Sequence, residues 1–401
     1  MNTFRIIAGY LFLFATLPSC QMEDHRPESI TKELLQRRLD ILVQKSLETY
    51  EQYPPIREKI YRSRTGFWTL RFADEADWCS GFYPGILWQL YGYSSKEPLM
   101  IGAKAYTSFL QKQALNTDSH DIGFKINSSY GQAWKISKEQ EYRSTLIQAA
   151  RSLSKRFDTR IQAIKSWDYN PGHYQYPLII DNLMNLELLF EASRLSNESG
   201  FYHIANSHLK TSLQHHFRKN FSSYHLINLD SLNGEVLGKE TNQGFSDESS
   251  WARGQAWALY GMTMAYRYTR DSSYLRQAEG IADFFFNHPN LPKDFIPYWD
   301  FDAPDIPKAP RDVSAGVIAA SALFELATYS KRRNEYLVWG DQVLLSLEGN
   351  TYQASRLPFF LDKSTGNMPI EEEIEVPIVY ADYYYVEALL RRLDFFRSSA
   401  V

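Results

Sequence analysis

Apolar residues recur at the three- and four-residue spacing of a buried helix face over most of the chain. The first such stripe is made by Leu34, Leu35, Leu39, Leu42 and Leu47. The same spacing recurs in later segments, which are 82–92, 97–112, 122–135, 139–156, 180–195, 200–217, 251–269, 272–288, 313–330, 334–348 and 378–395. The pattern predicts about twelve helices.

The links between these segments alternate in length. Short links, such as 94–96 and 270–271, join some helices. Long links, mostly rich in Gly, Pro, Asp and Ser, are 49–81, 113–121, 157–179, 218–250, 289–312 and 349–377. They separate five helical hairpins, and the last helix can pair with the first to make a sixth. This predicts an all-α fold, a six-hairpin (α/α)6 toroid whose long links form a cleft at one end.

Strand-like alternation occurs only within the links. Residues 224–229, Tyr-His-Leu-Ile-Asn-Leu, are strand-like, and Asn233-Gly234 follows as a turn signal. We therefore expect a small hairpin there and no sizeable sheet.

The N-terminus carries a targeting signal. Arg5 precedes a mostly apolar run over 6–17, which is too short to span a bilayer and indicates a signal peptide. Residues 17–20, Leu-Pro-Ser-Cys, resemble a bacterial lipobox, in which Cys20 would be lipidated. An ordinary secretory signal with a chance cysteine is the alternative. We expect a lipoprotein signal over 1–20, a tether over 21–29 and one catalytic toroid domain over 30–401.

This signal implies a lipid anchor in the cell envelope of a Gram-negative bacterium, in the periplasm or on the outer-membrane surface. No later apolar run approaches 18 residues, so we expect no transmembrane helix. The net charge of -4 without a basic run argues against nucleic acid as a partner. The HExxH, CxxC, GxGxxG and P-loop motifs are absent, so no metal or nucleotide cofactor is implied.

Two carboxylates stand where a long link enters a helix. Asp121 follows His120 at one helix start, and Asp181 lies between Ile180 and Leu183 at another. Apolar neighbours desolvate a carboxyl and raise its pKa, which favours a protonated acid near neutral pH. The alternative for both aspartates is an ordinary helix-start residue that favours the helix dipole.

Segment 242–257 combines an amide, a cation and an aromatic ring in Gln243, Arg253 and Trp257. Arg253 and Trp257 are four residues apart and share a helix face, and a guanidinium suits a carboxylate ligand. Pairing of Arg253 with Asp247 or Glu248 is the alternative.

Two other link segments, 77–85 and 371–373, and the aromatic content of the chain each allow less specific interpretations. Trp78, in the Gly/Pro/aromatic turn 77–85, would either stack on a sugar ring or plug the barrel mouth. Aromatic residues make up 15% of the chain, which fits a sugar site and equally fits the core of a large toroid. Residues 371–373, all Glu, predict an exposed acidic loop.

Five of these segments together resemble glycoside hydrolase family 88, the unsaturated glucuronyl hydrolases. They are Trp-Cys-Ser-Gly-Phe-Tyr-Pro-Gly at 78–85, His-Asp-Ile-Gly-Phe at 120–124, Asp-Asn-Leu-Met-Asn at 181–185, 243–248 with Trp-Ala-Arg-Gly-Gln-Ala-Trp at 251–257, and 376–384. The resemblance implies a six-hairpin α/α barrel. It also implies release of 4,5-unsaturated glucuronic acid from the non-reducing end of lyase-generated glycosaminoglycan oligosaccharides, by hydration of the C4=C5 enol ether.

The resemblance also implies roles for single residues. Asp181 matches the general acid/base, and Asp121 the second essential carboxylate, which positions the substrate and tunes Asp181. Arg253 is the candidate for the uronate carboxylate. The residues that match the substrate cleft are His120, Trp78, Trp167, His225, Gln243, Arg253 and Trp257. The implied partners are unsaturated uronic-acid oligosaccharides and, through the anchor alone, a membrane.

Two other functions compete with this one. An unsaturated rhamnogalacturonyl hydrolase would use the same barrel on pectin fragments, but the forms of 120–124 and 251–257 favour the glucuronyl enzyme. A non-catalytic glycan-binding lipoprotein would have no need of both Asp121 and Asp181. Some relatives carry a Ser/Lys sulfate-contact motif in the last long link; this link has Lys363 and Ser364, whose match to that motif stays open, and so does sulfate tolerance.

Overall fold

The computed structural model describes residues 29–398 except 54, 56–58 and 67–68. Cys20 and the predicted signal over 1–20 lie outside the described residues, as does nearly all of the tether. Twelve α-helices lie in the part that is described, and each matches a segment predicted from periodicity. None of these helices is both long enough and apolar enough to cross a bilayer.

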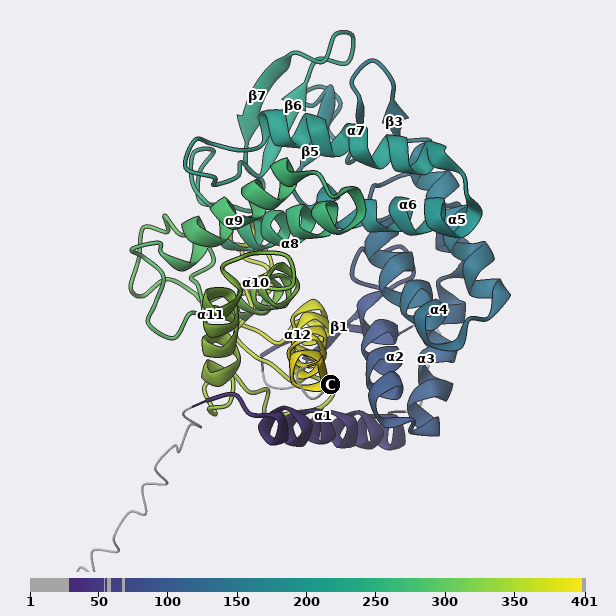
Figure 1. Cartoon of the computed structure of the whole chain (residues 1–401), viewed down its shortest axis with the longest axis vertical. Coiled ribbons are helices and arrows are strands. Elements are labelled where there is room, and N and C mark those ends of the chain that lie inside the picture. The colour runs from purple at the N-terminus through teal and green to yellow at the C-terminus, as the bar shows by residue number, and fades with distance from the viewer. Residues whose placement is uncertain (1–28, 54, 56–58, 67–68, 399–401) are drawn as a thin grey trace, which may run out of the picture.

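The helices form two concentric layers (Figure 1). The inner segments are α2 (Phe82–Ser94), the π-helical η2 (Gly123–Gly131) continued by α4 (Gln132–Ser137), α6 (Asn182–Ser196), α8 (Ala252–Thr269), α10 (Val313–Leu326) and α12 (Val379–Ser398). The outer ones are α1 (Lys32–Gln52), α3 (Glu97–Phe109), α5 (Gln140–Ser154), α7 (Ser199–His215), α9 (Ser272–Phe286) and α11 (Arg333–Ser346). Each inner segment contacts the next, and α12 contacts both α10 and α2, which closes the ring. The (α/α)6 barrel is therefore confirmed.

Sequence composition separates the two layers. Every residue of α10 is buried, and its sequence of small and apolar residues lets neighbours pack on all sides. Outer helices such as α9 are amphipathic, with Tyr274, Ala278, Ile281 and Phe285 buried on one face. The inner ring is therefore shielded from solvent along its sides, and only its two ends meet water.

Glycine permits one contact that positions the site. A Cβ atom on Gly123 would lie 2.4 Å from Cα of Asn185, so η2 and α6 approach closely only because Gly123 lacks one. The backbone N–H of Phe124 donates to Oδ1 of Asn185 at 2.8 Å across the same contact. This contact brings together the two helix starts that carry Asp121 and Asp181.

The small sheets lie in the links. The hairpin predicted around 224–229 is confirmed as β6 (Leu226–Leu229) and β7 (Val236–Glu240), with Gly234 at φ +77° in the turn. A third strand, β5 (Tyr176–Ile179), was not predicted and pairs antiparallel with β6. Two further hairpins pair β1 (Ile60–Thr65) with β2 (Thr69–Ala73), and β3 (Phe157–Asp158) with β4 (Ala163–Ile164).

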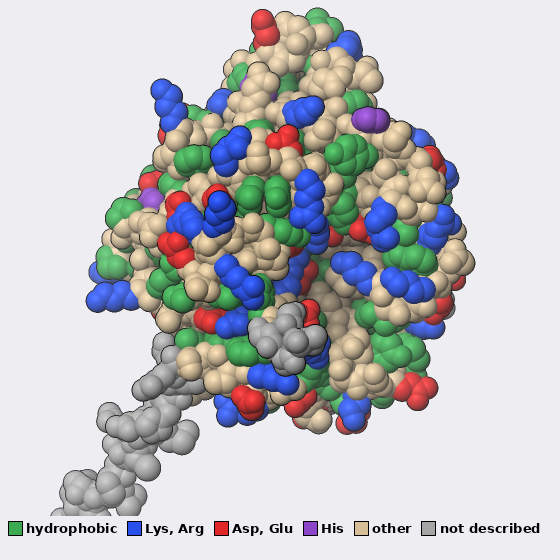
Figure 2. All heavy atoms as spheres, in the orientation of Figure 1, with side chains coloured by type: hydrophobic (Ala, Val, Ile, Leu, Met, Phe, Trp, Pro, Cys, Tyr) green, Lys and Arg blue, Asp and Glu red, His purple; other side chains and the backbone are tan. Residues whose placement is uncertain are grey.

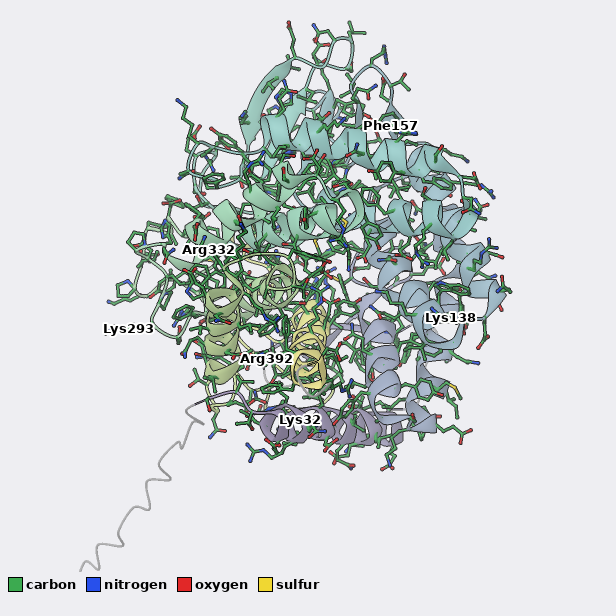
Figure 3. All side chains as sticks on the ribbon, in the orientation of Figure 1. Lys32, Lys138, Phe157, Lys293, Arg332 and Arg392 are labelled. Carbon is green, nitrogen blue, oxygen red and sulfur yellow. The ribbon has the colours of Figure 1, made fainter. Side chains whose placement is uncertain are left out.

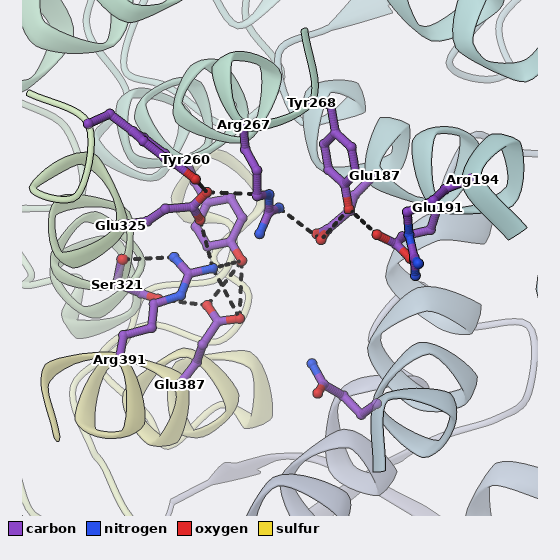
Figure 4. A network of polar contacts seen from close by, with 12 residues as sticks. Glu187, Glu191, Arg194, Tyr260, Arg267, Tyr268, Ser321, Glu325, Glu387 and Arg391 are labelled. Carbon is purple, nitrogen blue, oxygen red and sulfur yellow. Dashed lines mark hydrogen bonds and ion pairs between the residues drawn. The ribbon is translucent and has the colours of Figure 1, made fainter. Parts of the chain in front are cut away.

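An ionic network joins four inner helices where α12 ends (Figure 4). Arg267 of α8 lies 2.8 Å from Glu187 of α6 and 3.4 Å from Glu325 of α10. Arg391 of α12 lies 3.0 Å from Glu325 and 3.5 Å from Glu387. Figure 2 views this end, where Lys and Arg side chains surround a central hollow. Each buried charge here has a partner, which offsets its desolvation.

Bidentate ion pairs attach the last inner helix and the first outer helix to their neighbours. Arg392 of α12, labelled in Figure 3, donates to both carboxylate oxygens of Asp341 in α11 at 2.6 and 2.9 Å. Arg38 of α1 donates to both oxygens of Glu348 at 2.9 and 2.7 Å. These pairs hold both ends of the helical array in the ring.

The glycine contact predicts a stability effect. Gly123→Ala forces η2 and α6 apart, so its free energy of unfolding falls by about 1–3 kcal/mol. Gly200→Ala is the control, because Gly200 lies in α7 with nothing within 4 Å of an added Cβ. Urea unfolding of both variants checks this. Equal stability of the two variants would show that the η2–α6 contact tolerates a methyl group.

Candidate active site

The inner helices all begin at the end opposite the ionic network, because each outer helix returns the chain to that end. A cleft of about 290 Å³ opens there. Of the predicted site residues, those that line it are Trp78, Trp167, His225, Gln243 and Arg253. The structure therefore brings together predicted side chains from three separate long links and from the start of α8.

Asp181, Asp121 and His120 are not among the residues that line the cleft, but Oδ2 of Asp181 lies 3.8 Å from Nε2 of His225, which does line it. Strand pairing places Asp181 there, since Ile179 pairs with Leu226 and the N–H of Ile180 donates to the carbonyl of His225 at 2.9 Å. Asp181 is the N-cap residue of α6, but its side chain makes no capping hydrogen bond to that helix. Its Oδ2 has no hydrogen-bond partner among the described residues.

The electrostatics of Asp181 are those of a proton donor. Burial raises the pKa of its carboxyl to about 7; the cation of Arg253 opposes the shift, and the anion of Asp121 adds to it. The carboxyl is thus part protonated near neutral pH and can both release and accept a proton.

Asp121 is held next to it by side-chain hydrogen bonds. Ser119 Oγ donates to Asp121 Oδ2 at 2.8 Å, and His120 Nε2 lies 3.2 Å from Oδ1. The N–H of His120 donates to the carbonyl of Ser166, beside Trp167. Burial lowers the pKa of His120, which favours the neutral ring. The carboxylate is therefore held by Ser119 directly before the start of η2.

Arg253 is buried at the edge of the cleft. Its Nη1 donates to Asp312 Oδ2 at 3.0 Å and to the carbonyl of Thr365 at 2.5 Å, and its Nη2 donates to the carbonyl of Gly366. Gln243 Nε2 donates to the same Gly366 carbonyl at 3.1 Å. Arg253 thus ties the start of α8 to the last long link.

The sequence suggested a different partner for Arg253. Pairing with Asp247 or Glu248 is wrong: Asp247 accepts the N–H of Thr241, and Glu248 lies 3.6 Å from Arg218. The actual partner, Asp312, was missed because it also caps α10 by accepting the N–H of Ser314, as helix-start aspartates ordinarily do.

Aromatic residues line much of the cleft. Trp78 packs on Tyr380 with ring centroids 5.1 Å apart, and Trp167 stacks on Tyr169 at 4.7 Å. Tyr169, which the sequence did not single out, is 54% exposed and lines the cleft. Trp257 is 0% exposed, packs on Phe124 with ring centroids 5.2 Å apart and does not line the cleft, in contrast to its predicted place.

The acidic loop over 371–373 is also not wholly exposed. Glu373 is 5% exposed and accepts hydrogen bonds from Arg62 Nε at 2.9 Å and Ser63 Oγ at 2.5 Å. Burial alone would raise the pKa of Glu373, but its bonds with Arg62 hold it below the ordinary value. Arg62, 311 residues away in sequence, converts the predicted surface acid into a wall of the cleft.

Among the described residues, no group of three or more His, Cys, Asp or Glu side chains could hold a metal ion. The side chains that face the cleft supply carboxyl, imidazole, amide, guanidinium and aromatic groups. They suit acid–base chemistry on a ligand that carries rings and a carboxylate.

Comparisons with known proteins agree with this geometry. The model of Glycosyl Hydrolase Family 88 matches residues 56–289. An unsaturated glucuronyl hydrolase of Formosa agariphila is 46% identical over 79% of this chain and 80% of its own length. An unsaturated chondroitin disaccharide hydrolase of Streptococcus pneumoniae is 32% identical over 79% of this chain and 82% of its own. The crystal structure of an unsaturated glucuronyl hydrolase specific for heparin superposes with a TM-score of 0.88 at 40% identity, over 92% of this chain and 99% of that one.

The raised pKa of Asp181 predicts a pH-dependent stability difference. The carboxyl has a pKa of about 7 when folded against an ordinary value of 3.8, so folding favours its protonated form. Wild-type stability therefore falls relative to Asp181→Asn as pH rises from 4 to 7. Urea unfolding at several pH values should give nearly parallel curves below pH 4 and a growing advantage for Asp181→Asn up to pH 7. A constant difference across this range would contradict the raised pKa.

Proposed function

The chain belongs to glycosyl hydrolase family 88, and from this premise we propose that it is an unsaturated glucuronyl hydrolase. It releases 4,5-unsaturated glucuronic acid from the non-reducing end of lyase-generated glycosaminoglycan oligosaccharides. The similar proteins are named for glucuronyl and chondroitin disaccharide substrates, which supports this activity over pectin hydrolysis and over binding alone.

The reaction adds water across the C4=C5 bond. A protonated carboxylic acid gives its proton to C4, and positive charge develops at C5, where the ring oxygen stabilises it. Water then forms a bond to C5 and returns one proton to the carboxylate. The hemiketal that results opens at the C5–ring-oxygen bond, and the hemiacetal left at C1 releases the second sugar.

The proposed hydrolase function rests on the environment of Asp181. Its carboxyl is buried, lacks a hydrogen-bond partner at Oδ2 and has a pKa of about 7. One group can therefore give the proton to C4 and take one back from water. Asp121, fixed by Ser119 and His120, positions the sugar hydroxyls and keeps the proton affinity of Asp181 high through its negative charge.

The other cleft residues recognise the sugars. Arg253 and Gln243 lie together at the Gly366 carbonyl, and we assign the uronate carboxylate to this side of the cleft. Trp78 and Trp167 offer ring faces for the sugars. Trp257 is buried and packs on Phe124 outside the cleft lining, so we do not assign it a contact with the sugars.

Loss of ultraviolet absorbance from the conjugated enol ether measures this activity directly. We expect decay with the wild type on unsaturated disaccharides, and a kcat for Asp181→Asn that is lower by roughly 10³-fold because general acid and base are both lost. Asp305→Asn, an exposed aspartate with the same change of charge, should keep wild-type turnover. Near-wild-type turnover of Asp181→Asn would remove it from the catalytic role.

A panel of disaccharides with and without sulfate defines the substrate class in the same assay. Decay confined to pectin-derived substrates would indicate a rhamnogalacturonyl hydrolase. No decay of absorbance on either set of substrates, with folded protein, would favour a glycan-binding protein.

We also propose that the protein is anchored in the cell envelope by a lipid on Cys20, on the strength of the lipobox-like 17–20. Cys20→Ser should therefore move the protein from the membrane fraction to the soluble fraction and abolish incorporation of labelled fatty acid. Cys79→Ser is the control, because Cys79 is buried in the barrel. Unchanged fractionation of Cys20→Ser would contradict the anchor.

A further inference from the structure

A second pocket adjoins the segment that carries Trp167. It has a volume of about 370 Å³ and shares no lining residue with the cleft. Asp168 lines this pocket, whereas Trp167 and Tyr169, its neighbours in the chain, line the cleft. One short segment therefore contributes to both the pocket and the cleft.

Three cations gather in this pocket because a hairpin brings them together. β3 pairs with β4 through Phe157 and Ile164. The pairing continues one residue further, since the N–H of Lys165 donates to the carbonyl of Arg156 at 3.0 Å. Lys155, next to Arg156 in the chain, adds a third cation to the same pocket. Like charges opposite each other on paired strands are destabilising, so this arrangement favours the presence of an anion.

Asp168 supplies part of the negative charge. Its two carboxylate oxygens lie 2.9 Å from Arg156 Nη1 and 2.9 Å from Lys165 Nζ. Burial alone would raise the pKa of Asp168, but its bonds with Lys165 and Arg156 hold it below the ordinary value. The side chain of Asp168 is 57% exposed, so a dissolved anion can reach these two ion pairs and compete for their cations.

The rest of the positive charge in the pocket is not neutralised. Asp158, the other carboxylate of the lining, is paired with Arg160 at 2.7 Å. Lys155 makes no ion pair with any residue that the structure describes. Arg156 has a side chain only 6% exposed, and its Nη2 has no hydrogen-bond partner among the same residues. Four cations thus accompany two carboxylates, in a chain whose net charge is -4.

We propose that this pocket binds the sulfate or carboxylate groups of an anionic glycan, which compete with Asp168 for Lys165. The rings of Phe157, labelled in Figure 3, and of Tyr176 line the pocket together with Thr117, so a sugar meets aromatic and hydroxyl groups beside the cations. The choice of a glycan also rests on the proposed function, since the same segment lines the pocket and the cleft.

Binding in the pocket acts on the cleft through this segment. Asp168 lies between Trp167 and Tyr169, whose rings stack with centroids 4.7 Å apart. A glycan that takes Lys165 leaves Asp168 with Arg156 as its one cation among the described residues. The aromatic pair in the cleft is then held less firmly than in the free protein.

Titration calorimetry tests the site without turnover. The probe is a sulfated heparin tetrasaccharide whose non-reducing uronate is saturated, so that it has no C4=C5 bond to hydrate. It should bind the wild type, Lys155→Met should weaken binding by about tenfold, and Lys155→Arg should restore it. Lys308→Met is the control, because Lys308 is exposed and lies outside the pocket. Equal affinity of Lys155→Met and Lys308→Met would overturn the site.

Two further titrations separate the pocket from the cleft and a glycan from a free ion. Trp78→Ala removes a ring from the cleft and should bind the tetrasaccharide as the wild type does. Loss of binding in Trp78→Ala with normal binding in Lys155→Met would place the probe in the cleft and overturn the proposal. Inorganic sulfate should bind more weakly than the tetrasaccharide, and equal affinity would overturn the assignment to a glycan.

Asp168→Asn tests the competition. It removes the anion that occupies Lys165 and Arg156, so the tetrasaccharide should bind about two- to fivefold more tightly, whereas a purely structural role would give weaker binding. Unchanged or weaker binding would overturn the displacement of Asp168. A wild type that binds the tetrasaccharide but leaves the absorbance of every unsaturated disaccharide unchanged would contradict the proposed hydrolase function and not this site.

Discussion

The packing of α12 against both α10 and α2 turns a row of helical hairpins into a closed ring. Each outer helix returns the chain to the same end, so the inner helices share one direction, and closure brings their starts and the long links together around one rim. Neither the cleft nor the proximity of its side chains exists in any single hairpin. The bidentate pair between Arg392 and Asp341 and the buried contacts of the inner helices stabilise this closure.

The two ends of the ring treat buried charge in opposite ways. Around Arg267 and Arg391, each carboxylate contacts a guanidinium, which compensates its desolvation. At the cleft, Asp181 is buried without such a direct partner, and this costs stability whenever the carboxyl is ionised. This loss of stability on ionisation is the physical origin of the pKa of about 7 for Asp181, and the packing of the ring offsets it.

The cations of the cleft are neutralised before any ligand binds. Arg62 bonds to Glu373, and Arg253 bonds to Asp312 and to the carbonyls of the last long link. These bonds attach that link to β1 on one side and to α8 on the other. The walls of the cleft are therefore set by ion pairs between distant segments, and the substrate meets a site that is already formed.

The sequence by itself determined the helices, their alternation with long links and the hairpin of β6 and β7, because helical and strand periodicity depend on residues a few positions apart. It also marked Asp181 and Asp121 through their local motifs. Only the tertiary structure decided that Arg253 pairs with Asp312, that Glu373 is buried on Arg62, that Trp257 is buried away from the cleft and that His225 lies next to Asp181. Burial and ion pairing depend on contacts between chain segments tens to hundreds of residues apart. The local spacing of residues does not determine which of these segments come into contact.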